Sequence, residues 1–436
     1  MGAMKFFLAR ALFAATWLVA ADVALAQRLP SNFAADPSQV HVRLVTFGPG
    51  TEVHQYFAHD ALWVHDARTG ISALFNYGMF SFGPDMLPKY MKGILTFWVE
   101  ATPVKLTFQR YKEMNRSILV QELNLTNAQK ARLVRRLVHD IQPENRFYRY
   151  HHYTDNCTTR LRDDLDEALG GEFKKAFNVS GRLNYREHTW RYSQQDPIVH
   201  MALIFWMNDF MERPITRWDE AFLPLELVDL VAEFKTKDER GNLVPLVSST
   251  YDIYKSDHPG VPKNPAPKVE RYLALGVSLG VLALAMGLLY GFARSSKLKT
   301  LGRVLFGLCH AAFGASFGLL GILGSAMWAF TEHTVTYHNE NQLQANALTF
   351  LLLPMGLMFA FGHRGALRWT ARLMMLLSLL SVLGLLAKVL PVFDQYNALV
   401  MAMTVPINVG LGAVHWLMFV RDRRSQQMSA KQQQAA

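Results

Sequence analysis

Five long apolar stretches dominate the last third of the chain. Most are long enough to cross the hydrocarbon core of a bilayer, and the third is short enough to be tilted or re-entrant. They cover roughly Tyr272–Phe292, Val304–Phe330, Ala347–Phe361, Leu373–Val392 and Ala398–Val420. Residues 257–268 precede them and contain four prolines, which predicts an extended tether. We therefore expect a linker at 257–270, five transmembrane helices within 271–421 and a tail at 422–436.

The N-terminus has the pattern of a secretory signal. Lys5 and Arg10 lead, residues 11–21 are mostly apolar, and Ala24-Leu25-Ala26 supplies small residues for cleavage. We expect residues 1–26 to be a signal peptide, with an uncleaved anchor as the alternative. In either case residues 27–256 form an exported domain.

The distribution of Lys and Arg among the connections between the apolar stretches indicates the same topology. The connections 294–303 and 364–372 and the tail from Arg421 hold eleven Lys and Arg, whereas 331–346 and 391–397 hold none. The positive-inside rule makes the first group cytoplasmic, so five spans leave residues 27–270 outside. The formal net charge of +10 comes mainly from these basic connections, so we expect no nucleic-acid partner. A bacterial inner (cytoplasmic) membrane protein with a periplasmic catalytic domain is the predicted arrangement.

Within the exported part, strand and helix patterns alternate irregularly, which predicts an α+β fold. Residues 42–47, 58–66 and 73–77 read as strands, as do residues 94–100 and 104–120. Thr126 is expected to cap a helix that ends before Pro143. A second helix is expected from Asn156 to Gly170-Gly171, because Leu161, Leu165 and Leu169 recur every four residues.

Cys157 begins that second helix and is the candidate nucleophile. Only two cysteines exist, and Cys309 lies in an apolar stretch, so no disulfide framework forms in the exported domain. Free N–H groups and the dipole at a helix start favour a thiolate over a thiol. The alternative is a small buried apolar residue without a chemical role.

Two histidines share one face of the strand at 58–66. Because side chains alternate, His59 and His65 point to the same side, and a hairpin at Arg68-Thr69-Gly70 brings Asn76 or Tyr77 close to His59. His59 is the candidate general base, with Asn76, or else His65, orienting it. The alternative is that these histidines are satisfied within a sheet.

Further polar residues are candidates for substrate contacts. Arg160 and Arg162 lie one turn into the cysteine helix and are placed to meet carbonyl or phosphate groups, or to bridge Asp163 and Asp164 instead. The outer loop 331–341 is rich in His and Asn and lies on the predicted side of Cys157. The candidate set is Tyr77, Asn156, Arg160, Arg162, His333, Asn339 and Asn341. No metal or organic cofactor is indicated.

Several motifs together resemble the bacterial Lnb-type lipoprotein N-acyltransferases over nearly the whole chain. They are Phe57-Ala58-His59-Asp60-Ala61-Leu62, Phe75-Asn76-Tyr77-Gly78, Pro143-Glu144-Asn145-Arg146, Arg213-Pro214-Ile215-Thr216 and the run from Asp155 to Asp163 around Asn156-Cys157-Thr158. The usual glycine before the histidine of that family is Ala58 here, and the small residue after the cysteine is Thr158.

The resemblance implies a circularly permuted papain/NlpC-P60-like Cys-His domain followed by a five-helix transmembrane bundle. It implies that Cys157 and His59 move the sn-2 acyl chain of a diacylglyceryl-cysteine lipoprotein to its α-amino group through a thioester, giving a lyso-form lipoprotein. The partners would be diacylglyceryl lipoproteins and membrane lipid. The sequence leaves open a lipid or peptide hydrolase with the same dyad, and a non-catalytic membrane scaffold.

Overall fold

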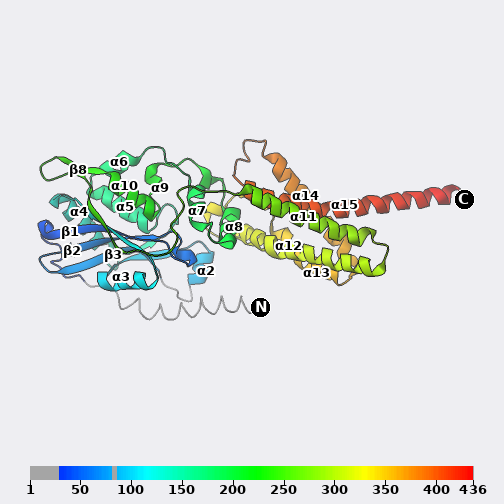
Figure 1. Cartoon of the computed structure of the whole chain (residues 1–436), viewed down its shortest axis with the longest axis horizontal. Helices are drawn as coiled ribbons and strands as arrows, with labels where there is room; N and C mark the ends of the chain where they lie inside the picture. The colour runs from blue at the N-terminus through cyan, green and yellow to red at the C-terminus, as the bar shows by residue number, and fades with distance from the viewer. Residues whose placement is uncertain (1–28, 81–85, 436) are drawn as a thin grey trace. The chain divides into compact units, whose positions relative to one another are not determined.

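The computed structural model describes residues 29–80 and 86–435 of the chain (Figure 1). The expected signal peptide, residues 1–26, lies outside the described residues. The chain forms two compact units. The first extends to Tyr192 and resumes at Arg213–Asn264, whereas the second comprises Ser193–Glu212 and the chain from Pro265 onward. The first unit is an α+β sheet domain, and the second contains five apolar helices.

A seven-stranded sheet in the order β6-β4-β3-β2-β1-β5-β9 is the framework of the first unit. All neighbouring strands are antiparallel. The hairpin predicted around Gly70 is confirmed, since β2 and β3 pair with Leu62 opposite Phe75. The strands are β1 (Val40–Phe47), β2 (His59–Asp66), β3 (Ile71–Met79), β4 (Thr96–Thr102), β5 (Ile118–Leu123), β6 (Phe147–Arg149) and β9 (Val247–Tyr254), with β7 (Lys235–Lys237) and β8 (Leu243–Pro245) forming a separate ribbon.

Helices cover both faces of this sheet, because its strands alternate apolar residues toward both sides. On one face Leu62, Phe75 and their neighbours pack against Leu161 and Leu165 of α5. The other face packs against α3 through Phe108 (Figure 1). The helices of the first unit are α2 (Met86–Met91), α3 (Val104–Glu113), α4 (Asn127–Asp140), α5 (Cys157–Ala168), α6 (Glu172–Phe177), α7 (Tyr185–Ser193, whose last residue belongs to the second unit), α9 (Arg217–Glu220) and α10 (Pro224–Glu233).

One predicted strand is wrong. Residues 104–120 were expected to be extended, but Val104–Glu113 forms α3, and β5 begins only at Ile118. Val104, Phe108 and Tyr111 are spaced as on one face of a helix, and this face packs on the sheet. Their aromatic and β-branched character favoured a strand, but helical spacing and burial of that face decided the outcome.

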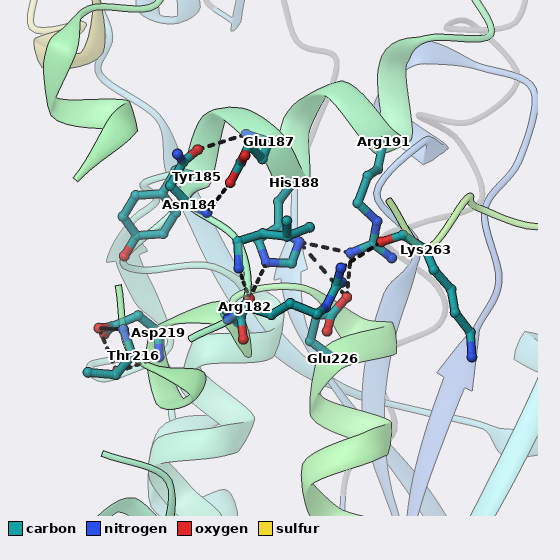
Figure 2. A network of polar contacts seen from close by, with 12 residues as sticks. Arg182, Asn184, Tyr185, Glu187, His188, Arg191, Thr216, Asp219, Glu226 and Lys263 are labelled. Atoms are coloured by element: carbon teal, nitrogen blue, oxygen red, sulfur yellow. Dashed lines mark hydrogen bonds and ion pairs between the residues drawn. The ribbon is translucent and has the colours of Figure 1, made fainter. Parts of the chain in front are cut away.

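A buried polar network holds the end of the first unit in place (Figure 2). His188 Nε2 lies 3.0 Å from Glu220 Oε1, and Arg191 donates to Glu226 at 2.7 Å and to the Pro262 carbonyl at 2.6 Å. Arg182 donates to the carbonyl of Lys263 at 2.9 Å. Residues 262–264, which composition places in a tether, are therefore bound to the body of the first unit.

The second unit contains five helical segments that are long and apolar enough to cross a membrane, which agrees with the predicted number. The third is composite, because 3-10 turns at Glu340–Leu343 and Ala347–Leu351 precede its α-helix. The helices are α8 (Pro197–Trp206), α11 (Val269–Phe292), α12 (Ser296–Phe330), α13 (Leu352–Ala360), α14 (Arg364–Ala387) and α15 (Ala398–Ala435), the last of which includes the expected tail.

The short apolar helix α8 belongs to this second unit although it precedes the linker in sequence. The indole N–H of Trp206 donates to the Leu320 carbonyl of α12 at 3.0 Å. Asn208 donates to the carbonyls of Thr334 and Tyr337. Residues 193–212 thus fold with the apolar helices.

Glycines allow α11 and α15 to pack backbone against backbone. A Cβ added at Gly280 would lie 2.4 Å from the Pro406 oxygen, and one at Gly276 would lie 2.5 Å from the Ala402 oxygen. Such spacing of small residues is typical of close helix pairs in membranes.

We predict that Gly280→Val destabilises the second unit by at least ~2 kcal/mol, because its side chain must displace the backbone of α15. Thermal unfolding in detergent measures the effect. Val281→Leu, at a neighbouring side chain that is 59% exposed, is the matched control and should leave the midpoint unchanged. An unchanged midpoint for Gly280→Val would contradict the close packing.

Candidate active site

Asn156 fixes the start of α5 and thereby the position of Cys157. Its side-chain oxygen accepts the backbone N–H groups of Thr158 and Thr159, both at 2.9 Å. Its amide nitrogen donates to the carbonyls of His152 and Phe222. Asn156 is 5% exposed, and its side-chain oxygen and nitrogen are both engaged in these hydrogen bonds. Its main role is therefore to cap the helix, which accounts for the asparagine at this position.

The half-buried Cys157 thiol faces the end of β2. The backbone N–H of Asp60 interacts with the sulfur, and the hydroxyl of Thr158 lies 3.7 Å from Sγ. On the β3 side, a Cβ added at Gly78 would lie 3.4 Å from the Cys157 Cβ, and the φ of this glycine is +86°. The bulge in β3 at this point therefore brings its backbone against the cysteine.

Burial raises the pKa of the Cys157 thiol. The Thr158 hydroxyl and the N–H groups of Asp60 and Thr158 act in the opposite direction, but burial is the larger effect. The helix start thus contributes the expected stabilisation of a thiolate without overcoming desolvation. The resting group is a thiol, and it needs a base to become a nucleophile.

His59 is held in the geometry of a neutral base. Its Nε2 lies 3.3 Å from Asn76 Oδ1, while the Asn76 amide donates to Thr102 Oγ1 at 2.6 Å. That second bond leaves Asn76 Oδ1 as an acceptor, so Nε2 carries the imidazole proton and Nδ1 is free to accept one. The hairpin therefore brings Asn76 to His59, as its register predicted.

Burial, reinforced by the positive charge of Arg116, lowers the pKa of His59 to about 4. The imidazole is therefore uncharged at neutral pH and able to take a proton. Phe47 and Tyr111 stack beside the ring on the α3 side of the sheet. Within the residues that the structure describes, His59 and Cys157 share no hydrogen bond. The imidazole lies on the α3 side of the sheet, α5 packs on the other side, and the sulfur meets β2 at the backbone N–H of Asp60.

The sequence analysis missed Asp60 as a site residue. Strand alternation turns its side chain to the opposite face from His59, where the cysteine helix packs, and the residue is fully buried. Thr46 donates to its Oδ1 at 2.6 Å. Burial raises the pKa of this carboxyl to about 7, and the negative charge of a Cys157 thiolate acts in the same direction. The available signal was an acidic residue directly before the apolar run Ala61-Leu62-Trp63-Val64 of the strand.

Residues 31–195 match the family model described as the Lnb N-terminal periplasmic domain. This part of the chain is similar to that domain. Comparisons with curated proteins and with solved structures found no significant match. The matched range contains Cys157, His59 and Asp60. Together with the five apolar helices, the match indicates a membrane protein with a periplasmic domain.

Two predicted residues of the Lnb-like domain lie in other polar clusters. His65 is at the far end of β2, six residues or roughly 20 Å from His59 along an extended strand, and its Nδ1 lies 2.9 Å from Ser72 Oγ. The Tyr77 hydroxyl is buried 2.8 Å from Asp140 and 2.7 Å from Asp164. The structure therefore places Asn76 rather than His65 beside His59.

The two arginines of α5 are engaged within the Lnb-like domain. Arg160 contacts both oxygens of Asp155, at 2.6 and 2.8 Å, and lies over the Tyr148 ring. Arg162 donates to Asp163 at 2.9 Å and to the Trp218 carbonyl at 2.8 Å. Bridging to a carboxylate, one of the two alternatives that the sequence left open, occurs at both positions, with Asp155 as the partner of Arg160.

The candidate residues of the outer loop lie in the second unit. Asn339 and Asn341 are buried, and both donate to the Phe205 carbonyl at 2.9 Å. The backbone N–H of His333 lies 3.3 Å from Thr331 Oγ1. The asparagines therefore fasten the end of α8 to this loop, and their role as substrate contacts stays a prediction.

Ala58, immediately before His59, has φ +64°, a conformation that favours glycine. This matches the resemblance, in which glycine is usual here. We predict that Ala58→Gly stabilises the protein by about 1 kcal/mol, because it removes the left-handed strain of an alanine. Thermal unfolding measures the change. Gly70→Ala is the reciprocal control, since Gly70 has φ +70° and open space around it, and should destabilise by a similar amount.

Proposed function

We propose that this protein is a lipoprotein N-acyltransferase. It moves the sn-2 acyl chain of a diacylglyceryl-cysteine lipoprotein to the α-amino group through a thioester on Cys157, leaving a lyso-form lipoprotein. The observation that carries the proposal is a cysteine at a capped helix start, next to the strand end that holds a neutral histidine, inside an Lnb-like domain.

The chemistry follows from these groups. His59 accepts the thiol proton as the sulfur attacks the ester carbonyl, the ester C–O bond breaks, and the imidazolium returns the proton to the leaving alcohol. The amine then attacks the thioester, the C–S bond breaks, and the cysteine thiol is restored. The backbone N–H of Cys157 is the donor in this proposal for the oxyanion of each tetrahedral intermediate, since those of Thr158 and Thr159 donate to Asn156.

The arrangement of elements supports a permuted papain/NlpC-P60-like site, because the histidine strand β2 precedes the cysteine helix α5 that packs on it. The apolar helices support a location in the bacterial inner membrane, where diacylated lipoproteins are found. A membrane-held enzyme avoids drawing acyl chains into water, which costs about 0.8 kcal/mol per CH₂. Diacylglyceryl lipoproteins and membrane lipid are the partners in this proposal.

We predict a fatty-acyl adduct on Cys157 when the full-length enzyme meets a diacylated lipoprotein whose amine is blocked. Peptide mass spectrometry should find it, and neutral hydroxylamine should remove it. Cys157→Ala should lack the adduct and the activity, whereas Cys309→Ala should retain both. A transferase that is active but never acylated on Cys157 would contradict covalent catalysis. Fatty acid release without amide formation would favour the hydrolase.

We also predict that His59→Ala lowers the rate of acyl-enzyme formation at least ~100-fold, since the buried thiol loses its base. His65→Ala, at the other end of the same strand face, should stay within a few-fold of the wild type. Single-turnover assays with mass detection separate the two. Equal losses in both variants would mean that the histidines act through the stability of the sheet.

A further inference from the structure

Three buried polar atoms of the first unit, two of them in residues that respond to charge on Cys157, have no hydrogen-bond partner within the described part of the chain. They are Asp60 Oδ2, the Tyr148 hydroxyl and the Tyr192 hydroxyl. All belong to the first unit, and their residues are at most 8% exposed. Buried polar atoms in native proteins are normally paired, so a group of unpaired ones calls for a ligand that pairs them.

Two of these groups, Tyr148 and Asp60, respond to a charge on the nucleophile. A charge on Cys157 raises the pKa of Tyr148 and of Asp60, in each case after the larger effect of burial. The negative charge of Asp60 in turn contributes, after burial and Glu226, to a raised pKa of Tyr192. The titratable groups that act on Asp60 or respond to it are thus Cys157 from α5 and Tyr192 from α7, together with His59, which lies on the opposite face of its own strand.

The missing partner is a donor, because an ionised carboxylate only accepts hydrogen bonds. The proposed reaction supplies such a donor. An α-amino group arrives at neutral pH largely as an ammonium, and it loses two protons on its way to an amide. His59 accounts for only one of them, which it passes to the departing Cys157 sulfur.

We propose that the Asp60 carboxylate binds the α-ammonium group of the acceptor lipoprotein and removes its first proton. This inference rests on the proposed function and names the acceptor site of the same reaction. The ammonium N–H bond breaks and its proton moves to Asp60 Oδ2, leaving a free amine and a neutral carboxylic acid. The amine forms the amide bond as the C–S bond breaks, and Asp60 afterwards releases its proton to water.

The local chemistry suits this role. With a pKa raised to about 7 by burial, the carboxyl exchanges a proton easily at neutral pH. Thr46 donates to Oδ1, and the Thr158 hydroxyl also lowers the pKa of this carboxyl. Oδ2 makes no hydrogen bond of good geometry within the described residues and is the oxygen proposed for the ligand. A carboxylate beside the thioester also favours a cationic acceptor over water, which accounts for transfer in place of hydrolysis.

Asp60→Asn tests the role, because it keeps an oxygen for Thr46 and removes the base. In the full-length enzyme, we expect the acyl adduct on Cys157 to form at near the wild-type rate. Its transfer to a peptide α-amine at pH 7 should slow at least tenfold, so that acyl-enzyme accumulates. Hydroxylamine, which is uncharged at neutral pH, should discharge both enzymes equally fast. The variant must take its acceptor as free amine from solution, so its rate of transfer should follow the ionisation of the α-amino group at about pH 8, and raising the pH should recover part of the lost rate.

Asp66→Asn is the matched control, on the same strand face as Asp60. Asp66 is also buried, but its oxygens accept backbone N–H groups of Ala34 and Arg68. This variant should lose thermal stability and keep the wild-type ratio of transfer to hydroxylamine discharge.

Stability gives an independent readout. The folded-state pKa of Asp60 is raised, so its contribution to stability falls as the pH rises from about 4 to about 7. Asp60→Asn should therefore leave the Tm at pH 8 unchanged or higher. A lower Tm, or equal slowing of acylation, amine transfer and hydroxylamine discharge, would show a structural role and overturn the inference. Absence of any adduct in the wild type would instead refute the proposed function.

Discussion

The cap on α5 is the interaction on which the site depends. Asn156 links the first turn of the helix to the carbonyls of His152 and Phe222, so the cysteine cannot shift without breaking contacts to two other segments. The helix then packs along the sheet through Leu161 and Leu165. The buried side chain of Asn156 thus fixes where the packed helix begins, and with it the position of the Cys157 sulfur.

Burial at that position removes much of the hydration of the polar groups around the sulfur. The thiol, the imidazole and the Asp60 carboxyl all lie where water is largely excluded, and in each case burial favours the uncharged form. At neutral pH the thiol and the imidazole are therefore uncharged, whereas the Asp60 carboxyl, with a pKa of about 7, is partly ionised. Charges in this site act in an environment where hydrogen bonds and fixed dipoles are stronger than they are in water.

Much of this arrangement follows from local sequence patterns. The leucine spacing after Cys157 and the asparagine before it specify a capped helix, and the turn at Gly70 sets the register that brings Asn76 to His59. The five apolar stretches are equally plain, because length and hydropathy alone define them. These features depend on neighbours a few residues apart.

Other features depend on long-range packing, and sequence reasoning missed them. The aromatic residues of α3 suggested a strand until the sheet provided a face for them. Asp60 was passed over beside a more conspicuous histidine, since only the placement of α5 shows which strand face meets the thiol. The association of residues 193–212 with the apolar helices depends on partners more than a hundred residues away.

Because residues 193–212 fold with the apolar helices, the boundary between the two units is crossed more than once along the chain. The chain passes from one to the other at residues 192–193, at 212–213 and at 264–265. A protease that cut only the proline-rich segment after Asn264 would separate the chain into two fragments, and α8 would stay covalently attached to the first unit while its hydrogen bond to α12 still held it to the second. No continuous stretch of the sequence contains the whole first unit without also carrying an apolar helix that folds elsewhere. The periplasmic unit is thus, in its covalent structure, a discontinuous domain with part of the membrane unit inserted into it.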